Sequence, residues 1–165
     1  MYRQGHSGLN ALLYAPIVPL VSVAWSLELA LVGALVAVGV ANVPDLDQPL
    51  PRIRHRGPTH TVWFAVLVGL VAGLGTALLV PAQPVAFRFG FVVGTGAILA
   101  HLAGDVVTPM GISPFAPVWR YHVTLEWFKS KNSRINRAFL LVGSIALFAS
   151  LLVTMGLSAV AAPAG

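Results

Sequence analysis

Cysteine is absent from this chain of 165 residues. Disulfide bonds and thiolate metal sites are therefore excluded, and any metal ion would need nitrogen and oxygen ligands. Charged residues are also scarce, at 9% of the chain, whereas an average soluble domain has roughly 25%. Hydrophobic residues make up 57%, and the mean hydropathy is +0.83. This composition excludes a water-soluble globule and predicts an integral membrane protein.

Acidic side chains are the rarest of the charged ones, with five against ten basic residues and a net charge of +5. A nucleic-acid-binding protein would gather its basic residues on a soluble surface, but here they flank apolar segments. We therefore expect no nucleic-acid partner, and we interpret the basic residues as anchors that set the membrane topology. The length suits a single membrane-embedded helical domain over residues 1–165. We also expect no cleaved signal peptide, because no small-residue cleavage site clearly follows the first apolar run.

About 20 apolar residues are needed for a helix to cross the hydrocarbon core of a bilayer. Five segments approach this length: 9–25, 27–43, 61–80, 87–104 and 138–160. The first contains Pro16 and Pro19, which predicts either a kinked span or a helix that is only partly inserted. A further stretch, 119–137, mixes aromatic with basic residues, as a membrane-interface helix or loop does. The expected fold is thus an all-α integral membrane protein, a helical bundle of four to five transmembrane spans with an interfacial segment.

Five spans would place the loops alternately on the two sides of the membrane. The basic residue on one side is Arg88, and the other side has nine: Arg3, Arg52, Arg54, Arg56, Arg120, Lys129, Lys131, Arg134 and Arg137. Because basic residues concentrate in cytoplasmic loops, this second side should face the cytoplasm. The chain is therefore expected to be a multi-pass protein of the inner (plasma) membrane.

Three short polar clusters interrupt the apolar sequence and contain every aspartate. They read Pro44-Asp45-Leu46-Asp47, His55-Arg56-Gly57-Pro58-Thr59-His60 and His101-Leu102-Ala103-Gly104-Asp105. A fourth polar group, His6, lies near the N-terminus. The predicted topology brings all of them to the cytoplasmic side. Since ionisable groups near hydrocarbon are costly unless they pair, bind metal or line a wet cavity, we expect one functional site there.

His101 and Asp105 are four residues apart. On a helix this spacing puts both side chains on one face, with Cβ atoms roughly 5–6 Å apart. The pair can hold a metal ion, or Asp105 can orient the ring of His101. The alternative is a histidine at a helix end that a neighbouring carboxylate satisfies for structural reasons.

Asp45 and Asp47 follow Pro44, where the apolar segment has ended. Two carboxylates on non-helical backbone can converge on one cation, and they repel each other without one. The alternative is a simple turn, because aspartate is a common turn residue.

Cluster 55–60 has the most specific local pattern. Gly57-Pro58 predicts a turn, with Thr59 and His60 in the first turn of the following helix. The free N–H groups of a helix start favour an anion, and Arg56 offers donors that match a phosphate. The alternative is a basic loop that touches lipid headgroups. Outside the clusters, His122 is interpreted as structural, Glu28 falls on the opposite side, and Glu126 stays open as a candidate.

These motifs together resemble the YdjM-type family of inner-membrane putative metal-dependent hydrolases, which is LexA-regulated in some members. The resemblance lies in Gly5-His6, the three clusters and Thr108-Pro109-Met110-Gly111, over about the first two thirds of the chain. It implies a small helical membrane protein with a metal site built from seven residues: His6, Asp45, Asp47, His55, His60, His101 and Asp105. Two positions depart from the family pattern. Gln48 stands where members often have histidine, and Asn136 where they often have glutamate. A weaker similarity, in ligand types and spacing, links the chain to the helical zinc phospholipases C and nucleases.

The expected function is metal-dependent hydrolysis of a phosphoester, in particular of a phospholipid, at the cytoplasmic membrane interface. One or two divalent ions, zinc or manganese, would polarise the phosphoryl group and activate water. The predicted ligands are His6, Asp45, Asp47, His60, His101 and Asp105. Asp47 would also be a candidate base, Arg56 would stabilise the developing charge, and His55 would protonate the leaving group. Two alternatives are an ion or proton transporter and a non-catalytic, metal-stabilised membrane module.

Overall fold

The computed structural model describes residues 1–49 and 55–161, and Arg52 and Arg54 lie outside this part of the chain. It contains six α-helices and two short 3-10 helices. The α-helices are α1 (Arg3–Tyr14), α2 (Ile17–Ala24), α3 (Leu27–Gly39), α4 (Val62–Leu79), α5 (Ala86–Val106) and α6 (Ser133–Ala161), and the 3-10 helices are η1 (Pro44–Asp47) and η2 (Pro58–His60). Within the described residues no strand forms, apart from an isolated bridge between Ile112 and Val123. The predicted all-helical class is confirmed.

Four helical segments are long and apolar enough to cross a membrane: Leu27–Asp47, Val62–Leu79, Ala86–Val106 and Ser133–Leu157. Helices α1 and α2 would make a fifth span together, although they meet at an angle of 45°. The bend falls at Pro16, whose missing N–H interrupts the helical hydrogen bonds. The predicted range of four to five spans is confirmed, and the bend predicted within segment 9–25 is present at Pro16.

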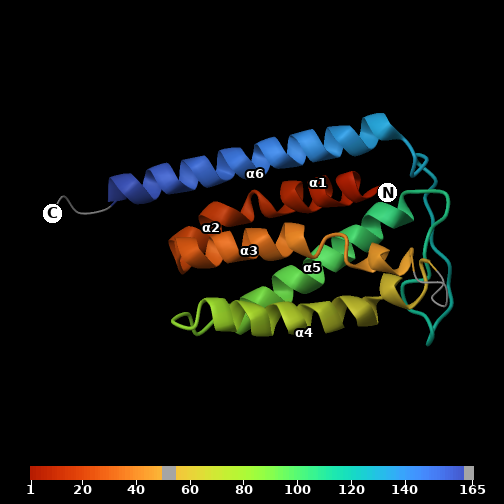
Figure 1. The fold of residues 1–165 in the computed structure, drawn as a ribbon, viewed down its shortest axis with the longest axis horizontal. Helices are drawn as coiled ribbons and strands as arrows, with labels where there is room; N and C mark the ends of the chain where they lie inside the picture. Colours follow the sequence, from red (N-terminus) through yellow and green to blue (C-terminus); the bar gives the residue numbers. More distant parts are fainter. Residues whose placement is uncertain (50–54, 162–165) are drawn as a thin grey trace.

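Figure 1 shows the helices running roughly along one direction. Helix α5 packs most extensively on α4, and α6 on α1, while α3 contacts α1, α2 and α5. Glycine permits the close approaches, because a Cβ atom on Gly90 of α5 would lie 2.3 Å from Thr76 Oγ1 of α4. Likewise, a Cβ on Gly8 of α1 would lie 2.2 Å from the backbone of Phe139 in α6.

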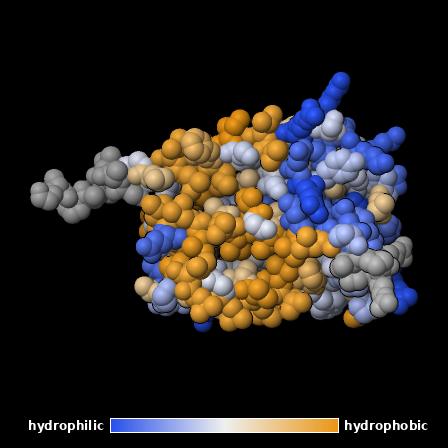
Figure 2. Space-filling model, viewed as in Figure 1, coloured by the Kyte–Doolittle hydropathy of each residue, from blue (hydrophilic) through white to orange (hydrophobic). Residues whose placement is uncertain are grey.

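Polar residues gather at one end of the bundle. Figure 2 shows hydrophilic surface concentrated there, and apolar surface over the helices beside it. This polar end contains the start of α1, both 3-10 helices and the loop of residues 107–132 (Figure 1). The turn between α4 and α5, near Arg88, lies at the opposite end. The stretch 119–132 forms no helix, and it exposes Trp119, Tyr121 and Trp127.

Two local predictions were wrong. Thr59 and His60 do not belong to the first turn of α4, since they form η2, and α4 begins after its N-cap residue Thr61. Asp45 and Asp47 do not lie on non-helical backbone, because Pro44–Asp47 forms a 3-10 turn. In both segments a proline begins the short helix, where its fixed φ angle suits the first position.

Candidate metal centre

Four elements bring the predicted ligands together at the polar end. His6 comes from α1, Asp45 and Asp47 from η1, His60 from η2, and His101 and Asp105 from α5. All six are buried, with at most 2% of their surface exposed. His55 and Arg56, which precede η2, are partly buried beside them. The structure thus unites every site residue that the sequence predicted, although these residues lie up to 99 positions apart in the chain (105 minus 6).

Four of these side chains converge on one point. His60 Nε2 lies 3.3 Å from His101 Nε2, and Asp105 Oδ2 lies 3.3 and 3.6 Å from these two nitrogens. Asp45 Oδ1 is 3.7 and 3.9 Å from the same pair. Ligands around a tetrahedral zinc ion, with bonds of about 2.0–2.1 Å, are separated by roughly 3.3–3.4 Å. The atoms of His60, His101 and Asp105 therefore have about the spacing of one coordination shell, and Asp45 Oδ1 lies slightly further from the two nitrogens. We call the four atoms the central ligand set.

The hydrogen bonds behind the two imidazoles point their free nitrogens inward. His101 Nδ1 is 2.8 Å from the carbonyl oxygen of Ala41, to which it can only donate. His60 Nδ1 is 3.0 Å from Thr59 Oγ1, and this hydroxyl donates in turn to Asp47 Oδ2 at 2.7 Å. Both Nε2 atoms are then left with a lone pair. Such hydrogen bonds to the second nitrogen are the usual way in which proteins orient metal-binding histidines.

The carboxylates around His60 favour a positive charge at the central ligand set. Burial alone would lower the pKa of His60, but the neighbouring carboxylates of Asp105 and Asp45 outweigh it and raise the pKa above its ordinary value. Asp105 Oδ1 also contacts two cationic groups, the Met1 amino group and Arg56. A metal cation at the central ligand set would likewise compensate the negative charge of Asp45 and Asp105.

Several buried polar atoms have no hydrogen-bond partner among the described residues. They are both ring nitrogens of His6, Asp45 Oδ2, Asp105 Oδ2, Arg56 Nε, Asn42 Oδ1 and Thr95 Oγ1. The first four belong to the predicted ligands. Because buried polar atoms are nearly always satisfied in folded proteins, unpartnered atoms in a histidine–aspartate cluster fit a bound metal ion.

His6 extends the cluster on one side. Its ring stacks on that of His101 with a centroid distance of 3.6 Å, and its Nε2 is 3.4 Å from Asp105 Oδ1. His6, His101 and Asp105 form one group with metal-ligand spacing, and Asp45, His60 and His101 form a second. The two groups share His101, whose Nε2 can bind only one ion, so a second adjacent ion would need His6 and a bridging carboxylate of Asp105.

Asp47 extends the cluster on the other side, where it lies behind His60. Its Oδ1 is 2.8 Å from His55 Nδ1, and its Oδ2 accepts the hydrogen bond of Thr59. Asp47, His55 and His60 form a third group with metal-ligand spacing. Both carboxylate oxygens are nevertheless occupied by protein donors, which suits an orienting role better than the role of a base.

Arg56 connects the cluster to the loop after α5. Its φ angle is +60°, in the left-handed region that non-glycine residues rarely adopt. Its guanidinium group donates to Asp105 Oδ1 at 2.7 Å, and to Thr108 Oγ1 and the Gly111 carbonyl at 3.1 Å each. The unusual backbone is therefore maintained by a network that fixes the guanidinium beside the central ligand set.

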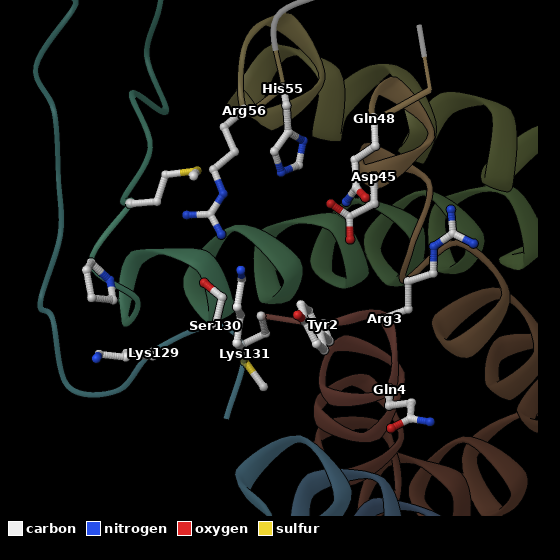
Figure 3. A pocket seen from close by; sticks show the side chains of 13 residues that line it. Tyr2, Arg3, Gln4, Asp45, Gln48, His55, Arg56, Lys129, Ser130 and Lys131 are labelled. Atoms are coloured by element: carbon white, nitrogen blue, oxygen red, sulfur yellow. The ribbon is translucent and has the colours of Figure 1, made fainter. Parts of the chain in front are cut away.

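A cavity of about 910 Å³ opens next to this cluster. Asp45, His55 and Arg56 line it on the cluster side, and Figure 3 shows their side chains directed into it. The rest of the lining comes from the start of α1 and the segment before α6, and it includes Arg3, Lys129 and Lys131. The cavity is large enough for a phosphate-bearing headgroup.

Sequence reasoning missed the groups that hold the ligands in place: Thr59, Thr108 and the Ala41 carbonyl. Thr59 and Thr108 lie within the quoted motifs, so the motifs were a usable signal. The backbone carbonyl of Ala41 leaves no trace in the sequence.

Of the two residues that depart from the family pattern, one lies at the cavity and the other lies between α1 and α6. Gln48 lines the cavity beside Asp45 (Figure 3). The Asn136 amide instead accepts from the Tyr2 N–H at 2.9 Å and donates to two carbonyls, which ties α1 to α6.

The remaining acidic and histidine side chains do not join the cluster. His122 and Glu126 are exposed on the loop of residues 107–132, and Glu28 lies in the first turn of α3, away from the polar end. None of the three belongs to a group with metal-ligand spacing in the part of the chain that the structure describes.

Residues 1–163 match the family described as YdjM inner membrane protein. The match covers nearly the whole chain, and the protein belongs to this family of inner membrane proteins. No curated protein and no solved structure matches the chain.

Proposed function

We propose that the protein is a membrane-bound, metal-dependent hydrolase that acts on a phosphoester at the cytoplasmic membrane interface. The observation that carries the proposal is the central ligand set. The two imidazole nitrogens lie 3.3 Å apart and 3.3–3.9 Å from the carboxylate oxygens of Asp105 and Asp45, and this set adjoins a cavity that a substrate can enter. A purely structural histidine–aspartate cluster needs no such cavity. Because zinc can expand to five coordination positions and manganese takes six, four protein donors beside this cavity still leave a position for water and substrate.

The donors are imidazole nitrogens and carboxylate oxygens, which suit zinc or manganese. When bound, such an ion acts as a Lewis acid, which polarises a phosphoryl oxygen and lowers the pKa of water. His60, His101, Asp45 and Asp105 would hold the ion, and His6 together with Asp105 would hold a second ion where two are bound. Asp47 would orient His60 through Thr59.

Two residues on the cavity wall would act on the substrate itself. His55 is the most exposed histidine of the cluster, with 34% of its side chain accessible, and its Nδ1 is engaged by Asp47. Its Nε2 is therefore the nitrogen that can hand a proton to the leaving oxygen. Arg56, fixed by Asp105 and the loop carbonyl, would stabilise negative charge that develops on the phosphoryl group.

The location supports a membrane lipid as substrate. The cavity lies at the polar end, beside the apolar surface of the helices (Figure 2). The described basic residues other than Arg88 belong to elements of this end, which by the positive-inside rule would face the cytoplasm. A phospholipid headgroup at this level could reach the cavity while its acyl chains stay in the bilayer.

The test compares metal content and phosphoesterase activity of the detergent-purified protein with those of His60→Ala and Asp105→Asn. His122→Ala is the matched control, because His122 is exposed and lies outside the cluster. We expect bound zinc or manganese and hydrolysis in the wild type and in His122→Ala, and the loss of both in the two cluster variants. Metal that raises the melting temperature without any hydrolysis would instead indicate a metal-stabilised module. Metal flux into proteoliposomes would indicate a transporter.

A further inference from the structure

The cavity has an unusual balance of charge. Arg3, Arg56, Lys129 and Lys131 line it, whereas Asp45 is the one carboxylate among its lining residues. Arg56 is paired with Asp105. Arg3, Lys129 and Lys131, which we call the cationic wall, form no ion pair with any carboxylate that the structure describes.

The rest of the chain has no acid to neutralise this wall. The three aspartates are engaged with the histidine cluster, Arg56 and the Met1 amino group. Glu28 lies at the far end of α3, and Glu126 is exposed on the loop without lining the cavity. Three cations that share one cavity without an internal counter-charge repel one another, and an anionic ligand would relieve this repulsion.

Geometry distinguishes the cationic wall from ordinary topology anchors. Figure 3 shows the Lys131 side chain directed toward Arg56 from the opposite side, with Ser130 beside it, and Arg3 next to Asp45. Arg134 and Arg137 are also exposed basic residues at the start of α6, yet they do not line the cavity. They have the position expected of anchors alone, whereas the three residues of the cationic wall line the cavity.

We propose that Arg3, Lys129 and Lys131 bind negative charge of the substrate beyond the single charge of a phosphodiester at the central ligand set. This inference rests on the proposed function, and it narrows the substrate class to a molecule with two anionic groups, or with one doubly charged phosphate that reaches both walls. Phosphatidic acid, whose phosphomonoester can carry two negative charges, has this chemistry, and zwitterionic phosphatidylcholine does not. Lysines suit such a group because they act as mobile point charges on a phosphate.

The experiment measures binding without turnover. Full-length protein in phosphatidylcholine nanodiscs, with EDTA present, is titrated with dansyl-acyl phosphatidic acid and, separately, with dansyl-acyl phosphatidylcholine, using energy transfer from tryptophan. Wild type should prefer phosphatidic acid, and the preference should weaken with salt. Lys129→Gln/Lys131→Gln should lose roughly threefold to fivefold in affinity for each lysine removed, as expected for exposed charges. Arg134→Gln/Arg137→Gln removes the same charge away from the cavity and should bind like wild type.

An equal loss in both double variants, or no loss in either, would overturn the inference, because the charge of the polar end as a whole would then explain binding. Sodium pyrophosphate distinguishes two sources of the anion. If it displaces the labelled lipid from wild type, the cationic wall takes a soluble phosphoryl group, and if it does not, the wall takes a lipid headgroup. Since EDTA removes the metal, a positive binding result stands even if no hydrolysis is ever detected, so the inference and the proposed function fail separately.

Discussion

The two halves of α5 are held in the bundle by different kinds of contact. In the first half, Gly90 and Gly94 let α4 approach so closely that added Cβ atoms would lie 2.3 Å from Thr76 Oγ1 and 2.5 Å from Ala72 Cβ. In the second half, His101 and Asp105 are completely buried among charged and polar partners. The first half depends on shape and the second on charge.

The difference between the two halves of α5 explains why the buried polar residues are concentrated at one end of the bundle. Helices in a bilayer gain little from the hydrophobic effect and associate through close packing, so the glycine half needs no polar groups. Buried carboxylates and imidazoles, in contrast, must lie next to one another or next to a cation, since each is costly without a partner. A change in the first half should therefore affect stability, and a change in the second should affect what the protein binds.

The largest effect is expected for His101→Ala. This variant removes one atom of the central ligand set, and it should lower metal affinity by more than the roughly 10–100-fold that loss of an orienting partner costs. The isolated variant should retain its helical circular dichroism while its metal content falls to background in elemental analysis. A variant that keeps stoichiometric metal would remove the distinction between the two halves of α5.

Asp47→Asn should have the next largest effect. Asp47 orients His60 through Thr59 and holds His55, but it donates no atom to the central ligand set. We expect metal affinity to fall by roughly 10–100-fold, with partial metal occupancy recovered at high metal concentration. Competition titration with a chelating dye measures this. A loss as complete as that of His101→Ala would show that Asp47 is itself a ligand.

The first half of α5 is tested by Gly90→Ala. The new Cβ would lie 2.7 Å from the backbone oxygen of Ala72, which cannot move aside. Overpacking of this kind costs about 1–3 kcal/mol, so the melting temperature in detergent should fall while metal affinity of the folded protein is unchanged. Gly96→Ala is the matched control on the same helix, because nothing lies within 4 Å of its Cβ position. It should be neutral or slightly stabilising.

The same contrast explains which features the sequence could predict. Hydropathy located the membrane spans within a few residues, since apolar length is a property of each segment alone. The spacing of His101 and Asp105 placed both on one helix face, and the alternation of loops placed the clusters at one end. The resemblance to the family, and then the family match, covered the same motifs.

The orienting contacts could not be predicted, because they join residues that only the folded chain brings together. The Ala41 carbonyl that fixes His101 is a backbone group, so no residue type signals it. The left-handed conformation of Arg56 depends on Thr108 and Gly111, more than 50 positions away. Asn136 could be noticed as a departure from the family pattern, but its role in tying α1 to α6 depends on the Tyr2 N–H.

The helix start after cluster 55–60 gives the smallest expected effect, and it tests the part of the sequence analysis that the structure corrected. Thr61 Oγ1 accepts from Phe64 N at 3.3 Å and donates to the Pro58 carbonyl at 2.9 Å. The side chain thus takes the place at the start of α4 that was predicted for a phosphate, and it also holds η2, which carries His60.

Thr61→Ala should therefore lower the free energy of unfolding by about 1 kcal/mol, the usual cost of a lost N-cap, and should also reduce metal affinity slightly because η2 loosens. Ser26→Ala is the matched control at the other end of the bundle, where Ser26 Oγ caps α3 by accepting from Leu29 N at 3.1 Å. It should lower stability by a similar amount and leave metal affinity unchanged, and Thr61→Ser should restore both properties. If Thr61→Ala instead abolished phosphoester binding at unchanged stability, the start of α4 would be an anion site, and the charge-dependent region would include the first turn of α4 as well as the second half of α5.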